Sequence, residues 1–377
     1  MYHVEKTKGI NLVKRFDYIL FIAVIVLTGI GIVVVRSATM TMPGANKMMM
    51  TQMAGVFMGV IAALVMSRID YKDFKTLGIL FYTGSVVLLI AVLFIGTGDN
   101  LGSRSWIRVG PVSLQPSELA KVGFILVTSI FLERIKEGAY TGKDVLKLGL
   151  YAAIPISLVV AQHDFGTTTV FLFIFFVMLF IAGLPYKYIA ALGGTFLAAL
   201  PFLWFFVFNE NRRNRIRVFL DPELDPLGAG FNTIKAKIAI GSGQLYGQGL
   251  FQGIQTQNNG VPVKESDFIF TVIGEELGFV GAAVVILLIF FIMMRCIYIA
   301  RNARDYYGSF LVIGVVAMQA FHVFENIGMT IGILPVTGVP LPFVSHGATS
   351  MLANYLAIGV VLSVSMRRKK TIFNTEE

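Results

Sequence analysis

The segment VPVKESDFIFTVIGEELGFVG, residues 261–281, carries three carboxylates where a polar stretch runs into an apolar one. If a helix begins near Ser266, Glu275 lies about 12 Å deeper than Asp267 and Glu276 faces away from it. Glycosidase carboxylate pairs are about 5–9.5 Å apart, so these residues cannot form one. Asp267 is therefore either a helix cap or a lone general base. We expect Glu275 and Glu276 in buried hydrogen bonds or ion pairs.

A second set of charges lies in SRSWIRVGPVSLQPSELAKVGFIL, residues 103–126. Gln115-Pro116-Ser117 predicts a helix start, because proline is favoured at the first helical position. Glu118 and Lys121 are three residues apart, so they share a helix face and can pair. Charges inside a membrane helix indicate a functional site, or an ion pair that only fixes helix packing.

Three residues of the preceding loop and one later aspartate are weaker candidates. Trp106 fits an ordinary belt tryptophan at the membrane interface, but Arg104 and Arg108 flank it in a loop with no other reason to be basic. Asp164, in QHDFGTT (162–168), either caps the following helix or binds cations or basic residues of a long loop.

The composition defines what must position these residues. The chain has 377 residues, 56% of them hydrophobic, against about 45–50% in soluble proteins. Its apolar blocks approach the roughly 20 residues that cross a bilayer as a helix. We therefore predict an all-α polytopic membrane protein, a single domain over 1–377, with about ten transmembrane helices. They are at 17–36, 50–67, 76–96, 115–133, 146–162, 166–184, 187–208, 268–294, 307–327 and 347–366.

Basic residues between the blocks set the topology. They concentrate in alternate connections, which places both termini in the cytoplasm. The net charge of +9 thus reflects membrane orientation, and we predict no nucleic-acid partner. One cysteine and four scattered histidines give no disulfide framework and no metal-type spacing, so no metal ligands are assigned.

Two connections on the outside differ from ordinary loops. Residues 209–266, between spans seven and eight, form one long basic extracytoplasmic loop in which 231–243 begins as an amphipathic helix and becomes glycine-rich. Such a loop is a candidate binding site, or a solvated face that meets anionic lipid. The glycines and prolines of 328–346 predict a re-entrant or interfacial segment, because irregular backbone at membrane depth must be buried in protein or line a cavity.

Five long motifs occur in a fixed order: SRSWIRVGPVSLQPSELAK, FLDPELDPLGAGFN, KIAIGSG, ESDFIFTVIGEELG and NIGMTIGILPVTGVPLPFVS. With them, essentially the whole chain resembles the SEDS family (shape, elongation, division and sporulation proteins), and most of all its elongation-type members. The chain reads QHDFGT, SHGATS and PVKESDF where the family usually has QPDLGT, SYGGSS and PExHTDF. Roles for His346 and for residues 263–265 are therefore not carried over.

The resemblance implies a peptidoglycan glycosyltransferase that polymerises lipid II at the outer face of the bacterial cytoplasmic membrane during cell elongation. Asp267 would be the general base, and inversion at the sugar carbon would need no covalent intermediate. Cationic side chains would bind the undecaprenyl pyrophosphate leaving group, and Trp106 would pack against lipid or sugar. The cationic residues are Arg213, Arg215 and Lys237, with Arg104 and Arg108 behind them. Glu118 and Lys121 match the family's membrane pair.

The sequence requires no cofactor, although a divalent cation such as Mg or Mn could share the pyrophosphate charge. The implied partners are lipid II, a class B penicillin-binding protein that cross-links the strands, and other membrane proteins of the elongation complex. Two further functions stay open. A lipid-linked precursor transporter (lipid II flippase) fits ten spans with intramembrane charges, and a non-catalytic scaffold would tolerate substitution of Asp267.

Overall fold

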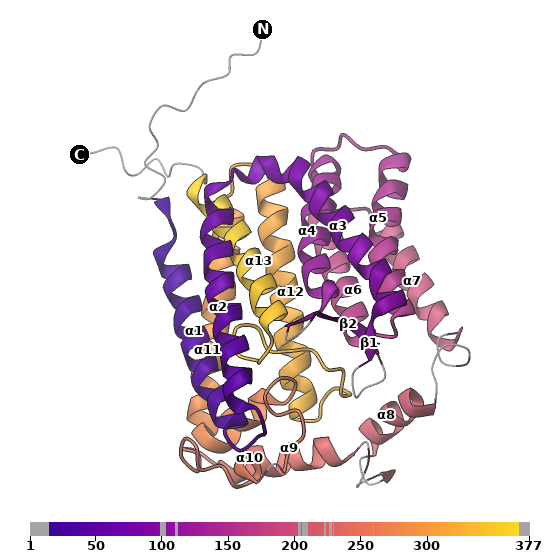
Figure 1. The fold of residues 1–377 in the computed structure, drawn as a ribbon. Helices are drawn as coiled ribbons and strands as arrows, with labels where there is room; N and C mark the ends of the chain where they lie inside the picture. The colour runs from indigo at the N-terminus through magenta and orange to yellow at the C-terminus, as the bar shows by residue number, and fades with distance from the viewer. Residues whose placement is uncertain are drawn as a thin grey trace, which may run out of the picture.

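The computed structural model describes residues 15–98, 103–109, 112–202, 205, 210–221, 224–225, 228, 230–258 and 260–368. Its helices are α1 (Tyr18–Thr39), α2 (Ala45–Arg68), α3 (Phe74–Ile95), α4 (Pro116–Lys136), α5 (Gly142–Ala161), α6 (Phe165–Ala182), α7 (Tyr186–Phe202), α8 (Glu210–Leu220), α9 (Phe231–Ser242), α10 (Ile254–Gln257), α11 (Ile269–Arg301), α12 (Tyr306–Thr330) and α13 (Ala348–Met366), with a 3₁₀ turn at Tyr71–Asp73 before α3. The predicted polytopic helical membrane protein is confirmed (Figure 1).

Eight helices within the described residues are long and apolar enough to cross a membrane: α1, α2, α3, α5, α6, α11, α12 and α13. Helix α4 has 21 residues, but charges at both of its ends set it apart from these. Helix α7 has 17 residues where it is described. The count of ten spans therefore stays a prediction, with α4 and α7 as the two additional candidates.

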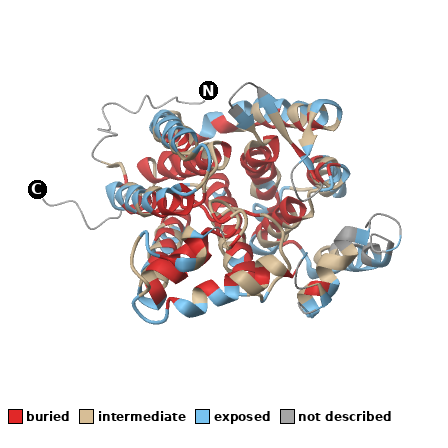
Figure 2. Ribbon diagram, turned by 60° about the horizontal axis from the view of Figure 1, so that its bottom comes forward, coloured by how far each residue is buried: buried red, intermediate tan, exposed pale blue. Residues whose placement is uncertain are grey.

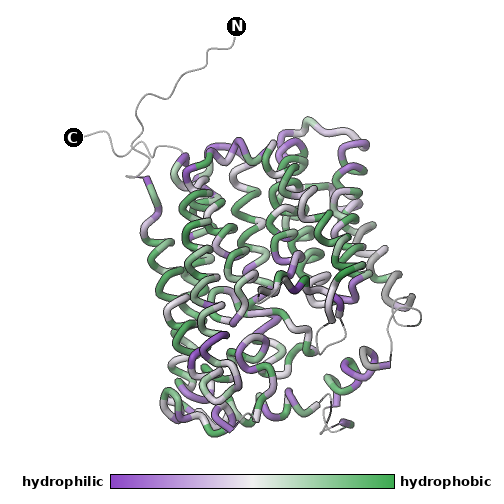
Figure 3. The backbone as a smooth tube through the Cα atoms, viewed as in Figure 1, coloured by the Kyte–Doolittle hydropathy of each residue, from purple (hydrophilic) through white to green (hydrophobic). Residues whose placement is uncertain are grey.

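The start of α1 and the end of α13 lie side by side at one end of the bundle, as an even number of spans requires. Asp17, which caps α1, accepts a hydrogen bond from Ser365 Oγ of α13 at 3.5 Å and lies 3.9 Å from Arg368. Helices α8, α9 and α10 of the long loop lie at the opposite end of the bundle (Figure 1). Apolar residues dominate the helices between the two ends (Figure 3).

Helix α13 is the centre of the bundle. Of its most apolar window 83% is buried, against 22% for α2 and for α5. Figure 2 shows that buried residues gather in the middle of the bundle. Small residues let α2 pack closely on α13, since a Cβ added at Gly55 or Gly59 would overlap Ala348 or Tyr355. Polar residues carried by α13 and its neighbours are thus enclosed by protein.

One element has no counterpart in the predicted all-α fold. Three short strands, β1 (Thr97–Gly98), β2 (Arg104–Val109) and β3 (Val112–Leu114), form an antiparallel sheet in the order β1-β2-β3 between α3 and α4. Its polar and aromatic residues alternate too briefly to give a strand signal among the long apolar blocks. The sheet fixes the approach to Pro116, the predicted and observed first residue of α4.

Helix α11 is interrupted where the sequence predicted a continuous span. Gly278 has φ 66° and ψ −166°, a backbone that glycine tolerates and other residues avoid. The loop before α11 replaces the missing helical bonds: Gln248 N donates to Glu275 O (2.9 Å), and Phe279 N donates to Gln244 O (2.9 Å). The break thus anchors the long loop to the membrane helix.

Candidate functional site

Asp267 lies in a turn, residues 261–268, immediately before α11. The helix begins at Ile269 and its N-cap position is Phe268, whose side chain makes no capping hydrogen bond, so Asp267 does not occupy the cap position of the first alternative. The Asp267 side chain is half-buried, and Ser266 Oγ donates to its Oδ1 at 3.0 Å. A carboxylate at the edge of a turn can be reached by a substrate group, as a general base must be.

Three consecutive carbonyls of this turn are held by the α12–α13 region. Asn326 Nδ2 donates to Asp267 O (2.8 Å), Ser345 Oγ to Ser266 O (2.7 Å) and His346 N to Glu265 O (2.8 Å). Asn326 is fully buried and Ser345 nearly so. The backbone that carries Asp267 is therefore fixed by residues about 60–80 positions later in the chain.

The segment between α12 and α13 enters the bundle, as predicted for a re-entrant segment. Val339, Leu341, Phe343 and Val344 are buried, and a Cβ at Gly31, within α1, would overlap the Phe343 and Val344 backbone. The side chain of Gln52 in α2 binds the end of this segment: it accepts from Gly347 N at 3.0 Å and donates to Ser345 O at 3.3 Å. Protein groups around the segment can bind its free backbone N–H and C=O groups, whereas lipid cannot.

Glu275 and Glu276 make buried hydrogen bonds, and their main partners are in the long loop. Glu275 accepts from Gln255 N (2.6 Å), Thr256 N (2.9 Å) and Thr256 Oγ1 (2.6 Å). Glu276 accepts from Phe251 N (3.0 Å), Ser37 Oγ (2.7 Å) and Gln257 Nε2 (3.0 Å). These carboxylates therefore fasten α10 and its flanking turns to α11 and α1.

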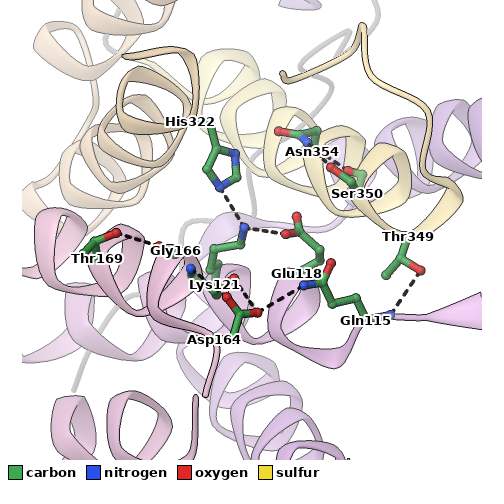
Figure 4. A network of polar contacts seen from close by, with 11 residues as sticks. Gln115, Glu118, Lys121, Asp164, Gly166, Thr169, His322, Thr349, Ser350 and Asn354 are labelled. Atoms are coloured by element: carbon green, nitrogen blue, oxygen red, sulfur yellow. Dashed lines mark hydrogen bonds and ion pairs between the residues drawn. The ribbon is translucent and has the colours of Figure 1, made fainter. Parts of the chain in front are cut away.

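The Glu118–Lys121 pair exists and is larger than predicted (Figure 4). Lys121 Nζ donates to Glu118 Oε1 at 2.7 Å and lies 2.7 Å from His322 Nε2, with all three residues buried. An ammonium group has only donors, so the ring nitrogen of His322 is the acceptor. This triad joins α4 to α12 in the middle of the bundle.

Asp164 caps α6, accepting from Thr167 N at 3.0 Å and Thr167 Oγ1 at 2.9 Å, so the capping alternative is confirmed. It also accepts a longer bond, 3.4 Å, from Gln115 Nε2 at the start of α4 (Figure 4). The backbone N–H of Gln115 donates to Thr349 Oγ1 of α13 at 3.4 Å. The turn at Asp164 thus ties α6 to α4 and α13.

The residues before α4 face outward from the small sheet. Arg104 and Arg108 on β2 are exposed, and Trp106 between them is half-buried and pairs with Thr97 of β1. Alternation along a strand places all three on one face, while the buried Ser105 lies on the other. The structure therefore groups these three candidates.

The remaining cationic candidates are divided between two helices. Lys237 on α9 is exposed, and its Cε and Nζ occupy the space where a Cβ at Gly332 would be, against the end of α12. Arg213 and Arg215 are on α8, which lies apart from the bundle (Figures 1 and 2). Arg213 donates to Phe205 O at 3.1 Å and lies 3.8 Å from Glu210. Lys237 thus lies against the α12–α13 region, which also binds the Asp267 turn. The arginines of α8 lie at the periphery of the molecule.

The sequence reasoning missed Lys264, His322, Asn326 and Ser345. The signal for two of them was present, because Gln319, His322 and Asn326 recur at helical spacing within an otherwise apolar span. No comparable signal marks Lys264 or Ser345, because Lys264 binds Thr256 across an irregular loop and Ser345 binds the distant Ser266. Across the described residues, no group of three or more His, Cys, Asp or Glu side chains gathers as a metal site.

Comparisons with known proteins find relatives over most of the chain. Residues 18–370 match the model of the FtsW/RodA/SpoVE family, described as cell cycle proteins. The chain is 36% identical to the peptidoglycan glycosyltransferase MrdB of Escherichia coli over 323 residues, covering 85% of this chain and 86% of the relative. It is 31% identical to the peptidoglycan glycosyltransferase RodA of Treponema pallidum, covering 94% of this chain and 99% of the relative.

A solved structure extends the likeness to the fold. A chain from a peptidoglycan synthase complex that coordinates polymerization and crosslinking superposes with a TM-score of 0.77 at 28% identity, covering 93% of this chain and 97% of that one. The match of sequence and fold runs over nearly the whole chain. The chain belongs to the FtsW/RodA/SpoVE family, the SEDS family.

Proposed function

We propose that this protein polymerises lipid II into glycan strands at the outer face of the cytoplasmic membrane. Its family and the names of its relatives make it an enzyme of the peptidoglycan glycosyltransferase class. The observation that carries the finer proposal is the fixed turn at Asp267, whose three successive carbonyls are each held by α12 or the segment after it. A preorganised carboxylate needs no rearrangement to accept a proton.

In this reaction the hydroxyl of one lipid II attacks the sugar carbon of another. Asp267 takes the hydroxyl proton, the new glycosidic bond forms with inversion, and undecaprenyl pyrophosphate leaves with the bonding electron pair. Lys237 lies beside the end of α12, the helix whose Asn326 holds the Asp267 carbonyl, and Arg104 and Arg108 are exposed on the sheet that leads into α4. Their charge stabilises the pyrophosphate as it departs.

Arg213 and Arg215 have a smaller part in this proposal than the resemblance implied. Because α8 lies apart from the bundle, these arginines meet the diphosphate only if α8 approaches. We propose elongation as the cellular role on the resemblance alone. A partner that cross-links the strands, of the class B penicillin-binding type, is proposed because a structural relative belongs to a complex of polymerization and crosslinking.

The deciding experiment uses purified protein in detergent with lipid II, with and without Mg²⁺ or Mn²⁺. We expect polymer from the wild type and at least about a hundredfold less from Asp267→Asn, because general acid–base catalysis contributes about 10²–10⁴-fold. Asp73→Asn is the matched control, since Asp73 is an exposed aspartate before α3. Polymer from Asp267→Asn at the wild-type rate would disprove the base. No product from the wild type in detergent, with lipid II movement in vesicles, would instead support the transporter.

A further inference from the structure

Lys264, three residues before Asp267, is a fully buried lysine outside the membrane helices. Its Nζ donates to Thr256 O, at the short helix α10. Burial lowers the pKa of Lys264, while the nearby carboxylates of Glu265, Glu275 and Glu276 act in the opposite direction. A charge is retained at a buried position only where specific partners compensate its desolvation.

The partner of Lys264 is itself held by a carboxylate. Glu275 accepts from Thr256 N at 2.9 Å and from Thr256 Oγ1 at 2.6 Å, while Lys264 binds the carbonyl of the same residue. A cation and an anion thus hold opposite polar groups of Thr256. Charge-assisted hydrogen bonds of this kind are roughly twice as strong as neutral ones.

Glu275 is in turn fixed where α11 is broken. Its carbonyl accepts from Gln248 N at 2.9 Å, and a Cβ at Gly243 would overlap the Gly274 and Glu275 carbonyls. Lys264 is therefore connected, through Thr256 and Glu275, to backbone of α11 next to the break at Gly278. This backbone cannot shift without breaking its hydrogen bonds to the loop. Lys264 links the Asp267 turn to this rigid part of the molecule.

The backbone between these contacts is strained. Val263 has φ 54°, an unfavourable conformation for a β-branched residue. Val263 O also accepts from Ser266 N (3.3 Å) and Phe268 N (3.2 Å), so it closes the turn around Asp267. Strain of this type persists only when the surroundings over-determine the conformation, and it concentrates at functional sites. Lys264 is the adjacent residue that supplies such a constraint.

We propose that Lys264, Thr256 and Glu275 form a positioning chain that sets the Asp267 carboxylate for proton transfer. The α12–α13 region holds the carbonyl side of the turn, and this chain holds the side that precedes it. The inference rests on the proposed function, because it assigns Lys264 and Glu275 to the reaction in which Asp267 is the base. Neither residue is expected to touch the substrate.

The test measures kcat, KM and lipid II affinity for Lys264→Met, Lys264→Arg, Glu275→Gln and the double variant Lys264→Met/Glu275→Gln. A misplaced catalytic group can cost about a hundredfold in rate, so we expect kcat to fall about ten- to a hundredfold in Lys264→Met with KM within about twofold of wild type. Lys264→Arg should recover part of the rate. The double variant should lose no more than the worse single variant, because both act through Thr256.

The control is Lys235→Met, which removes a lysine of the same loop whose ammonium lies over the Phe231 ring. Its kcat should be unchanged. Thermal unfolding is measured for every variant, and Thr256→Val, which replaces the hydroxyl bound to Glu275 by a methyl group, takes the place of any variant that does not fold. Wild-type kcat in Lys264→Met or Thr256→Val, additive losses in the double variant, or a loss confined to KM would each overturn the positioning chain. A wild type that makes no polymer would overturn the proposed function instead.

Discussion

Glu118 and the neighbouring Glu275 and Glu276 are buried carboxylates in two different regions of the molecule, and they are satisfied in different ways. In the middle of the bundle, Glu118 is paired with the ammonium of Lys121, which also contacts His322. At the end of the bundle that carries the long loop, Glu275 and Glu276 accept hydrogen bonds chiefly from backbone N–H groups of the loop and from the hydroxyls of Thr256 and Ser37. The first arrangement needs a second charge inside the membrane, and the second needs a loop folded around the carboxylates.

The difference indicates what each region does. The ion pair lies within α4, and Lys121 also binds His322 of α12, so the three side chains hold these two helices together. Removal of either charge leaves the other buried without its partner. A carboxylate that accepts hydrogen bonds from several N–H groups gives a loop a fixed shape, because each bond restricts the backbone conformations that the loop can adopt. The region at the long loop is thus the one in which the position of Asp267 is determined.

The largest effect is expected from Lys121→Met. The variant leaves Glu118 buried without its cation, and breaking a buried pair costs about 3–5 kcal/mol of the free energy of unfolding. Thermal or denaturant unfolding in detergent measures the loss. The double variant Glu118→Gln/Lys121→Met should be more stable than Lys121→Met alone. If both are equally destabilised, the ion pair is not the source of the cost.

A smaller effect is expected from Glu276→Gln. The amide keeps the shape of the carboxylate but replaces one acceptor oxygen with a donor that faces Phe251 N or Ser37 Oγ. An unsatisfied buried donor costs about 1–3 kcal/mol. Hydrogen exchange of residues 248–257 should increase more than that of α12. Equal increases in both segments would show that Glu276 stabilises the whole bundle and not the loop.

The smallest effect is expected from Glu210→Gln on α8. Glu210 is 67% exposed and lies 2.7 Å from Arg217, and exposed pairs contribute about 0.2–1 kcal/mol. The melting temperature should therefore change little, and raising the salt concentration should remove the difference because exposed charges are screened. A loss as large as that of Glu276→Gln would mean that α8 is docked more firmly than its peripheral place indicates.

Much of the fold could be predicted from the sequence, because the signals are local. Apolar blocks near the length of a bilayer, Pro116 at the start of α4, and the alternation of basic loops each depend on a few adjacent residues. The break in α11 could not be predicted this way. Gly278 is one of several glycines in spans, and only its close crossing with Gly247 makes it the point of interruption.

The same distinction between local and tertiary signals applies to the candidate site. The sequence alone determined that Asp267 stands at a boundary between polar and apolar residues, that it cannot pair with Glu275 or Glu276, and that Glu118 and Lys121 share a face. These follow from spacing, which any helix imposes. Only the tertiary structure decided that Asp267 is not a helix cap, that Lys237 lies against Gly332 while Arg213 and Arg215 lie at the rim, and that Lys264 is buried on Thr256. Lys237 and Gly332 are far apart in the chain, while Lys264 and Thr256 are eight residues apart in irregular backbone. Spacing along one helix carries no information about either contact.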